Sequence, residues 1–317
     1  MSRYILGRLL LMIPLLVGIS LVTFAIVRFA PGDPARLLAD PEQLTTTQLA
    51  AARQELGLDD PAPVQYAKMM RGLLTGQLLS FKTRRPTLAL IAERLPTTAT
   101  LSTLAFLFGI TGGVALGVAQ ALRPYGRLDD LCTAVSLFGF AVPGFWLAQM
   151  LVLLFAVRLR WLPAGGIRPV GATGWNPLAM APYLVLPTLV LGTGLLAGVA
   201  RYTRSAMLDA LGQDYVRTAR AKGLAERVVV ARHALRNSLL PVITLAGFYF
   251  PALVGGAVVV ETIFALPGVG RLALDSVFAR DYPMILTINL LGAAAVLVGN
   301  LFADIGYAVV DPRIRFK

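Results

Sequence analysis

Long apolar runs separated by shorter polar stretches make up most of this chain. Six of these runs are near or above the roughly 20 residues that an α-helix needs to cross a bilayer. They cover residues 9–27, 97–122, 131–157, 183–200, 239–260 and 284–310. The third run is interrupted by Pro143 and Gly144, and the fifth contains Pro251. The pattern predicts six membrane-spanning helices, two of them with a break that is either a hinge or a simple packing kink.

The composition supports a membrane protein and argues against a soluble one. The chain of 317 residues is 56% hydrophobic and 15% charged, whereas soluble domains carry about 25% charged residues. A net charge of +12 in so apolar a chain indicates retention of Lys and Arg on the cytoplasmic side rather than a nucleic-acid partner. The single cysteine, Cys132, excludes a disulfide within the chain. The expected fold class is all-α integral membrane.

The short loops predict the orientation in the membrane. With the amino terminus inside, the inner side holds Arg3, Arg8, Arg123, Arg127, Arg201, Arg204, Arg217, Arg220, Lys222, Arg227, Arg232, Arg236, Arg313, Arg315 and Lys317. The short outer loops hold only Arg158, Arg160, Arg168, Arg271 and Arg280. This bias places both termini in the cytoplasm. The first run exceeds the 7–15 residues or so of a signal-peptide core, so an uncleaved first helix is expected.

The long outer segment between the first two spans is expected to fold into helices. The stretch "TTTQLAAARQELGL" offers Thr caps, a helical run and a stop at Gly57, and Asp60 and Pro61 open a second helix. Within the spans, small residues recur every four positions, which predicts close helix packing. They are Gly109, Gly113 and Gly117, and then Gly194 and Gly198.

Several catalytic motifs are absent from the sequence. No lysine follows a glycine, so the chain cannot supply a P-loop for ATP. The only histidine, His233, excludes an H-E-x-x-H zinc site and is expected to face a partner or solvent. No G-x-S-x-G nucleophile motif occurs. An enzyme is therefore disfavoured.

Polar residues at membrane depth are few. Asn300 and Asp304 share one face of the last span at four-residue spacing, which makes them candidates for the transport path. Alternatively, Asp304 simply reaches the inner interface. Arg28 and Glu261 fall at outer ends of spans, where anchoring at the membrane interface is expected.

The basic stretch "DYVRTARAKGL" at 214–224 carries a further pattern. In a helix, Val216, Ala219 and Gly223 form one narrow face of little bulk, which a partner surface could approach closely. Cationic side chains beside it suit carboxylates on that partner. A second basic amphipathic helix is predicted from "LAERVVVARHALRNSLLP". The alternative is a surface helix on anionic lipid, which explains the charge but not the small residues.

These segments resemble one family along essentially the whole chain. "DYVRTARAKGL…RHALRNSLLPVIT" is similar to the cytoplasmic loop of permeases of binding-protein-dependent ABC importers, in the dipeptide/oligopeptide/nickel branch, B-type subunit. "APGDP" (30–34), "IAERLPTTATLS" (91–102), "AVPGFWLAQMLVLLFAVRLRWLPAGG" (141–166), "VETIFALPGVGRLALDSVFARDYPMI" (260–285) and the final "DPRIRFK" stand at matching places relative to the spans.

The resemblance implies a six-helix type I ABC importer permease bundle. Its expected parts are a cytoplasmic start and first span (1–30), an extracytoplasmic helical segment (31–96), a five-helix core with a cytoplasmic coupling loop at 201–238 (97–310), and a cytoplasmic tail (311–317). The residues implied to dock on an ATPase are Asp214, Tyr215, Val216, Arg217, Thr218, Ala219, Arg220, Ala221, Lys222, Gly223 and Leu224, with Gly223 as the glycine of the motif.

The family also implies partners and a mechanism. A C-type permease would complete a heterodimer in the prokaryotic inner membrane, two cytoplasmic ATPases would bind ATP and Mg, and an extracytoplasmic protein would deliver the solute. This chain would bind no cofactor or metal and catalyse no reaction, and would transport by alternating access. The cargo stays open among dipeptides, oligopeptides, nickel complexes and sugars. A self-sufficient secondary transporter or channel and a membrane-embedded enzyme are the competing interpretations.

Overall fold

The computed structural model describes residues 2–38, 45–169, 171–172, 174, 176–239, 242, 249 and 257–310. These residues form helices, joined by turns and one isolated bridge between Leu79 and Pro86. The elements are α1 (Ser2–Phe29), α2 (Pro34–Leu38), α3 (Thr46–Glu55), α4 (Ala62–Leu74), α5 (Thr87–Leu122), α6 (Arg127–Ala141), α7 (Gly144–Leu151), η1 (Val152–Arg158), α8 (Pro177–Leu211), α9 (Asp214–Ala221), α10 (Glu226–Val228), η2 (Val229–Leu235), α11 (Arg236–Ser238), α14 (Val258–Ile263), α15 (Val269–Phe278) and α16 (Tyr282–Val310). The all-α class is confirmed.

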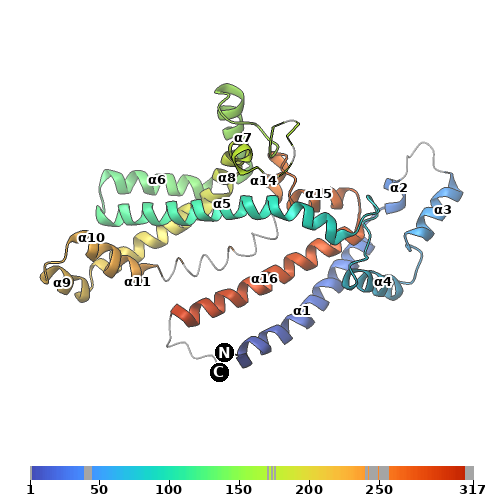
Figure 1. The fold of residues 1–317 in the computed structure, drawn as a ribbon, viewed down its shortest axis with the longest axis horizontal. Coiled ribbons are helices and arrows are strands. Elements are labelled where there is room, and N and C mark those ends of the chain that lie inside the picture. The colour runs from blue at the N-terminus through green and yellow to red at the C-terminus, as the bar shows by residue number, and fades with distance from the viewer. Residues whose placement is uncertain are drawn as a thin grey trace.

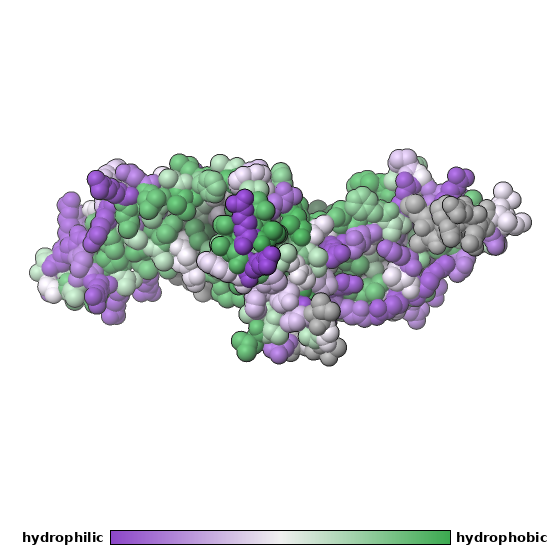
Figure 2. Space-filling view, turned by 90° about the horizontal axis from the view of Figure 1, so that it is seen from above, coloured by the Kyte–Doolittle hydropathy of each residue, from purple (hydrophilic) through white to green (hydrophobic). Residues whose placement is uncertain are grey.

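Four of the described helices are long and apolar enough to cross a membrane. They are α1 over Ile5–Phe29, α5, α8, and α16 over Tyr282–Leu301. Figure 2 shows a broad hydrophobic region between the hydrophilic left end and the centre of the molecule, where a smaller hydrophilic group lies. In α1 only 11% of the most apolar window is buried, as expected for a helix that faces lipid or a partner subunit. The predicted fifth span, 239–260, lies mostly outside the described residues.

The predicted third span is a broken helix. Its two halves, Arg127–Ala141 and Gly144–Arg158, meet at an angle of 107°. Val142 is extended, with φ −77° and ψ 125°, because the residue before a proline is disfavoured in the helical region. Pro143 therefore does more than kink a continuous helix, and α7 turns sharply away from α6 (Figure 1).

Helices α5 and α8 form the packed centre of the bundle. A Cβ on Gly109 would lie 2.7 Å from the Leu195 side chain, and one on Gly113 2.6 Å from Val199. Gly117 is held as closely, against the carbonyl of Ala200 at 2.6 Å. The close approach predicted for these three glycines is confirmed. For Gly194 and Gly198 it stays a prediction, since no described atom lies within 4 Å of a Cβ built on either.

The outer segment packs on α1, which lies beside α16 (Figure 1). Thr45 caps α3 in a capping box with Gln48, and Gly57 follows the helix with φ +65°, so both predicted helices of this segment are confirmed. Tyr66 on α4 joins Ser20 on α1 through hydroxyls 2.6 Å apart.

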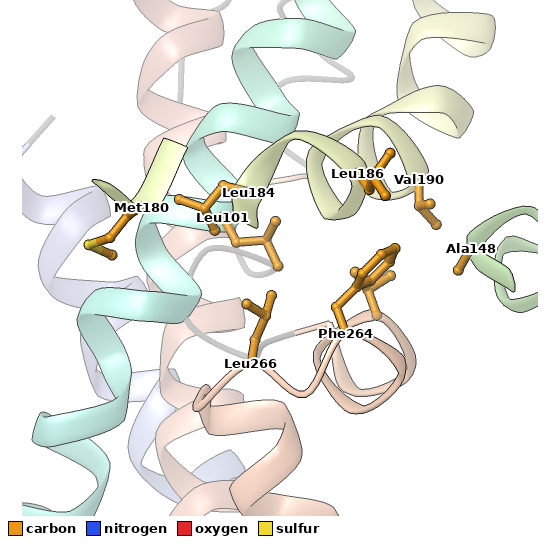
Figure 3. Close-up of a cluster of buried hydrophobic side chains, with 9 residues drawn as sticks. Leu101, Ala148, Met180, Leu184, Leu186, Val190, Phe264 and Leu266 are labelled. Carbon is orange, nitrogen blue, oxygen red and sulfur yellow. The ribbon is translucent and has the colours of Figure 1, made fainter. Parts of the chain in front are cut away.

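A buried apolar cluster lies at the outer end of the α5–α8 pair. Leu101 of α5, Leu184 and Leu186 of α8, and Phe264 and Leu266 of the turn after α14 contribute to it. Figure 3 shows these side chains converging from three parts of the chain that are far apart in sequence. The cluster fixes the turn at 264–268 against the bundle.

Candidate functional site: helix α9 and its support

Helix α9 carries the basic motif and ends where the sequence predicts. It runs from Asp214 to Ala221. Asp214 lies in the first turn, where its carboxylate interacts favourably with the positive end of the helix dipole. Gly223 follows with φ +77°, a conformation that glycine adopts without the strain of a Cβ. The N–H of Gly223 donates to the carbonyl of Arg220 at 2.9 Å, and the chain turns back toward α10.

The small face of α9 points into the protein. Val216 is fully buried and Ala219 is 4% exposed. Both pack against Val229 of η2, with Leu211 at the edge of the cluster. The prediction of a partner surface is therefore wrong for Val216 and Ala219, whereas Gly223 is exposed and its role stays a prediction. Burying the apolar residues of α9 under η2 removes them from water, and this leaves the polar residues outside.

The exposed face of α9 is mainly polar and charged. The side chains of Asp214 and Arg217 are 95% and 75% exposed, and Arg217 Nη1 lies 3.4 Å from Asp214 Oδ1. Arg220 donates to both carboxylate oxygens of Glu226, at 3.1 and 2.6 Å. This hydrogen bonding lowers the pKa of Glu226 and raises that of Arg220. Among the described residues, Lys222 makes no ion pair.

The exposed residues of the predicted docking segment lie together on this surface. They are Asp214, Tyr215, Arg217, Thr218, Arg220, Ala221, Lys222, Gly223 and Leu224. A long cationic side chain on this face, such as that of Arg217, reaches into solvent, where a separate protein can contact it.

The second basic helix of the loop supports α9 from behind. It is helical as predicted, over Glu226–Val228, Val229–Leu235 and Arg236–Ser238. The middle part is a π-helix, in which each hydrogen bond spans five residues instead of the four of an α-helix. Ala234 packs against Met207 and Ala210 of α8. Ser238 Oγ donates to the carbonyl of Ala206 at 3.1 Å. His233, on the same helix, is half-buried.

An ion pair between α8 and α6, close to this loop, was not predicted from the sequence. Arg204 of α8 donates to Asp129 of α6 through Nε at 2.7 Å and Nη2 at 2.6 Å. Asp129 also accepts from Gln120 Nε2 at 3.2 Å and from the Tyr125 N–H at 2.9 Å. The sequence did offer one signal for this pair, an aspartate in the first turn of a predicted helix. It contains several arginines that could pair with this aspartate, and their positions along the chain do not say which one does.

Two carboxylates at the end of the bundle away from α9 are structural. Glu261 is fully buried and accepts from Thr98 Oγ1 at 2.8 Å and from the N–H of Arg271 at 2.9 Å. Its predicted role as an interfacial anchor is wrong, because the turn at 264–271 folds over it. Asp281 is buried likewise and accepts from the N–H of Phe81 at 2.9 Å, which joins the outer segment to the start of α16.

Arg28 also has a protein partner. Its Nη1 donates to Gln65 Oε1 and its Nη2 to the carbonyl of Asp60 at 3.4 Å. It therefore holds α4 on the end of α1, and its anchoring at the membrane interface stays a prediction.

Of the two residues predicted to line the transport path, Asn300 and Asp304, the structure describes the side chain of Asn300. Asn300 and Asp304 both fall in α16, and the Asn300 side chain is exposed. The side chain of Asp304 lies outside the described residues. Their role stays a prediction. In the part of the chain that the structure describes, no group of three His, Cys, Asp or Glu residues is placed to hold a metal ion.

Comparisons with known proteins agree with this arrangement. Residues 113–316 match the family of binding-protein-dependent transport system inner membrane components, and residues 1–102 match its N-terminal family. The oligopeptide transport system permease protein AppB of Bacillus subtilis is 43% identical over the whole of both chains. The glutathione transport system permease protein GsiC of Salmonella typhimurium is 40% identical, also over the whole of both chains.

A solved structure shares the fold. A chain of the MetNI methionine ABC transporter in an inward-facing conformation superposes with a TM-score of 0.53 at 18% identity, over 72% of this chain and 99% of that chain. The apolar helices and the family match thus define a multi-pass membrane permease. The chain belongs to the family of inner-membrane components of binding-protein-dependent transport systems.

Family membership decides between the functional classes left open by the sequence. The chain is a permease subunit of an ABC importer, and ATP hydrolysis lies in separate subunits. The competing secondary transporter and membrane enzyme are thereby set aside.

Proposed function

We propose that this permease imports peptides or related small solutes, and that residues 214–224 couple it to a cytoplasmic ATPase. The names of the similar proteins, which include an oligopeptide and a glutathione permease, support the cargo class. The observation that carries the coupling role is the exposed charged face of α9, with Asp214 and Arg217 both projecting into solvent. A docking helix needs such a face together with a firm attachment.

The attachment follows a continuous packed route. Val216 and Ala219 fix α9 to η2, and Ala234 fixes η2 to Met207 of α8. Helix α8 in turn packs on α5 through Gly113. A displacement applied to α9 therefore moves the packed centre of the bundle, because close-packed helices shift as units rather than deform.

The docking chemistry is ionic. Arg217 and Lys222 present cations suited to carboxylates in an ATPase cleft, while Arg220 is held by Glu226 within the loop. The partner ATPases bind ATP and Mg, and this chain binds neither. Their closure moves the coupling helices, the bundle opens outward to the loaded receptor, and hydrolysis returns it inward.

The assembly would place this chain beside a C-type permease as a heterodimer, with two ATPases inside and a solute-binding protein outside. Both termini would face the cytoplasm, as the distribution of arginines favours. The outer segment of α3 and α4 would then face the receptor side.

A charge-reversal experiment tests the coupling role. The double variant Arg217→Glu and Lys222→Glu, in the complete transporter in nanodiscs, should lower receptor-stimulated ATP hydrolysis about tenfold, since each reversed contact repels its partner carboxylate. Arg123→Glu, in the turn between α5 and α6, is the control and should behave as the native chain. Native stimulation in the double variant would reject the role.

A further inference from the structure

A cavity of about 340 Å³ opens at the outer end of the bundle. Arg94, Pro96 and Thr97 of α5 form one side, and Ile167 and Arg168 of the loop before α8 form another. Met180 and Pro267 complete the apolar part, and Met180 belongs to the buried cluster seen in Figure 3. This volume lies in the range of about 300–1,000 Å³ typical of small-molecule sites.

Hydrogen bonds hold the walls of this cavity in place. The N–H of Gly166 donates to the carbonyl of Phe264 at 2.8 Å, which ties the loop before α8 to the turn after α14. The N–H of Val269 donates to Thr98 Oγ1 at 2.8 Å, which ties the same turn to α5. Because all three walls are joined, the cavity is formed before any ligand enters.

The charge in the cavity is positive. Arg168 and Arg94 both line it. Arg168 is oriented by one hydrogen bond, from Nη1 to the carbonyl of Gly174 at 2.7 Å, and its other N–H groups remain available. Arg94 makes no hydrogen bond or ion pair among the described residues. Glu93, the only acid among the described residues of the lining, is bound by Arg85.

We propose that this cavity binds the carboxylate of an organic anion that carries an apolar group next to it. Guanidinium groups hold carboxylates with two parallel hydrogen bonds, and the pair of Arg94 and Arg168 offers donors from two walls. Pro96, Ile167 and Met180 supply the surface for the apolar group. A peptide carboxyl end with an apolar last side chain fits this description, and that identification alone rests on the proposed function.

The position of the cavity makes it a first contact for an entering solute. It lies at the outer end of α5, beside the turn at 264–268, so a solute entering from the extracytoplasmic side meets it before the membrane-spanning part of the bundle. A bound carboxylate would also bridge α5 and the loop before α8. The cavity therefore selects for negatively charged solutes at entry.

A binding measurement tests this proposal without ATP or transport. The complete transporter in nanodiscs, without receptor, is titrated with N-acetyl-leucine, and saturation transfer to the methyl protons of the probe is followed by NMR. N-acetyl-leucinamide, which lacks the charge, is the matched probe. The acid should bind at least about fivefold more tightly than the amide, and salt should weaken it.

Variants assign the binding to the two arginines. Arg94→Gln and Arg168→Gln should each weaken binding of the acid at least about fivefold, and Arg94→Lys should restore part of it. Arg71→Gln, on the exposed side of α4, should leave binding unchanged. Equal binding of acid and amide, retained binding in either glutamine variant, or no saturation of the acid would overturn the proposal. If residues 214–224 did not couple to an ATPase, the binding measured by saturation transfer would be unchanged, because it requires no ATP.

Discussion

Arg204 and Asp129 join α8 to α6 through two parallel hydrogen bonds of 2.7 and 2.6 Å. The Asp129 side chain is 4% exposed and that of Arg204 26%, so the pair is shielded from most of the solvent. It lies near the end of α8 that leads into α9. Neither residue is part of the basic motif, yet both determine how that motif is attached.

Replacing Asp129 by Asn should destabilise the protein by about 2 kcal/mol, because Arg204 loses its charged acceptor in a partly buried place. The matched control is Asp130→Asn, which alters the exposed neighbour. Thermal unfolding in detergent measures both. Equal melting temperatures of the two variants would show that the ion pair contributes nothing.

Enlarging Ala219 tests the inward orientation of α9. Ala219→Leu should destabilise the loop by about 1–3 kcal/mol, because the added atoms must fit between α9 and Val229. Ala221→Leu, two residues further on the exposed side, should have little effect. Limited proteolysis at the loop reports the difference, and greater sensitivity of the Ala221 variant would mean that the face is assigned the wrong way round.

The glycines of α5 and α8 provide a paired comparison. Gly113→Ala would place a methyl group 2.6 Å from Val199 and 2.8 Å from the carbonyl oxygen of Leu196, so α5 and α8 must move apart. Gly198→Ala meets no described atom and should be neutral or stabilising by about 0.5–1 kcal/mol, as expected for alanine in a helix. Melting temperatures in detergent should separate in that order, and the reverse order would refute the packing.

Thr98 is predicted to hold the outer turn through its hydroxyl. Thr98→Val removes the donor to Glu261 and the acceptor for Val269, and should cost about 1.5–3 kcal/mol because a buried carboxylate loses a hydrogen bond. Thr262→Val, whose hydroxyl is exposed and bonds only within its helix, is the control. Hydrogen exchange of the Val269 amide should rise in the first variant only. Unchanged exchange would count against this role.

Hydropathy alone predicts four of the six spans, α1, α5, α8 and α16, because insertion of a helix depends on the apolar residues of that helix. The same holds for the caps of the outer helices, where Thr45 and Gln48 are neighbours in sequence. Motif resemblance added the family, which the comparisons confirm.

The sequence could not predict which face of a helix is buried, nor which distant residues pair, and the reason is physical. Periodicity indicates that Val216 and Ala219 share a face, but not which surface covers that face. Equal four-residue spacing likewise cannot distinguish Gly113, which is packed against α8, from Gly198, which meets no described atom. The bonds of Asp129 and Glu261 join residues 75 and 163 positions apart, and such partners are chosen by the fold.

Site-specific cross-linking tests the central claim most directly. In a transporter whose Cys132 is replaced by Ser, Arg217→Cys places a thiol on the exposed face of α9 and Ala219→Cys places one on its buried face. A cysteine-to-lysine cross-linker should join position 217 to an ATPase subunit, and position 219 should stay unlinked. Absence of any link from position 217 in an active complex, or an equal link from position 219, would contradict the account.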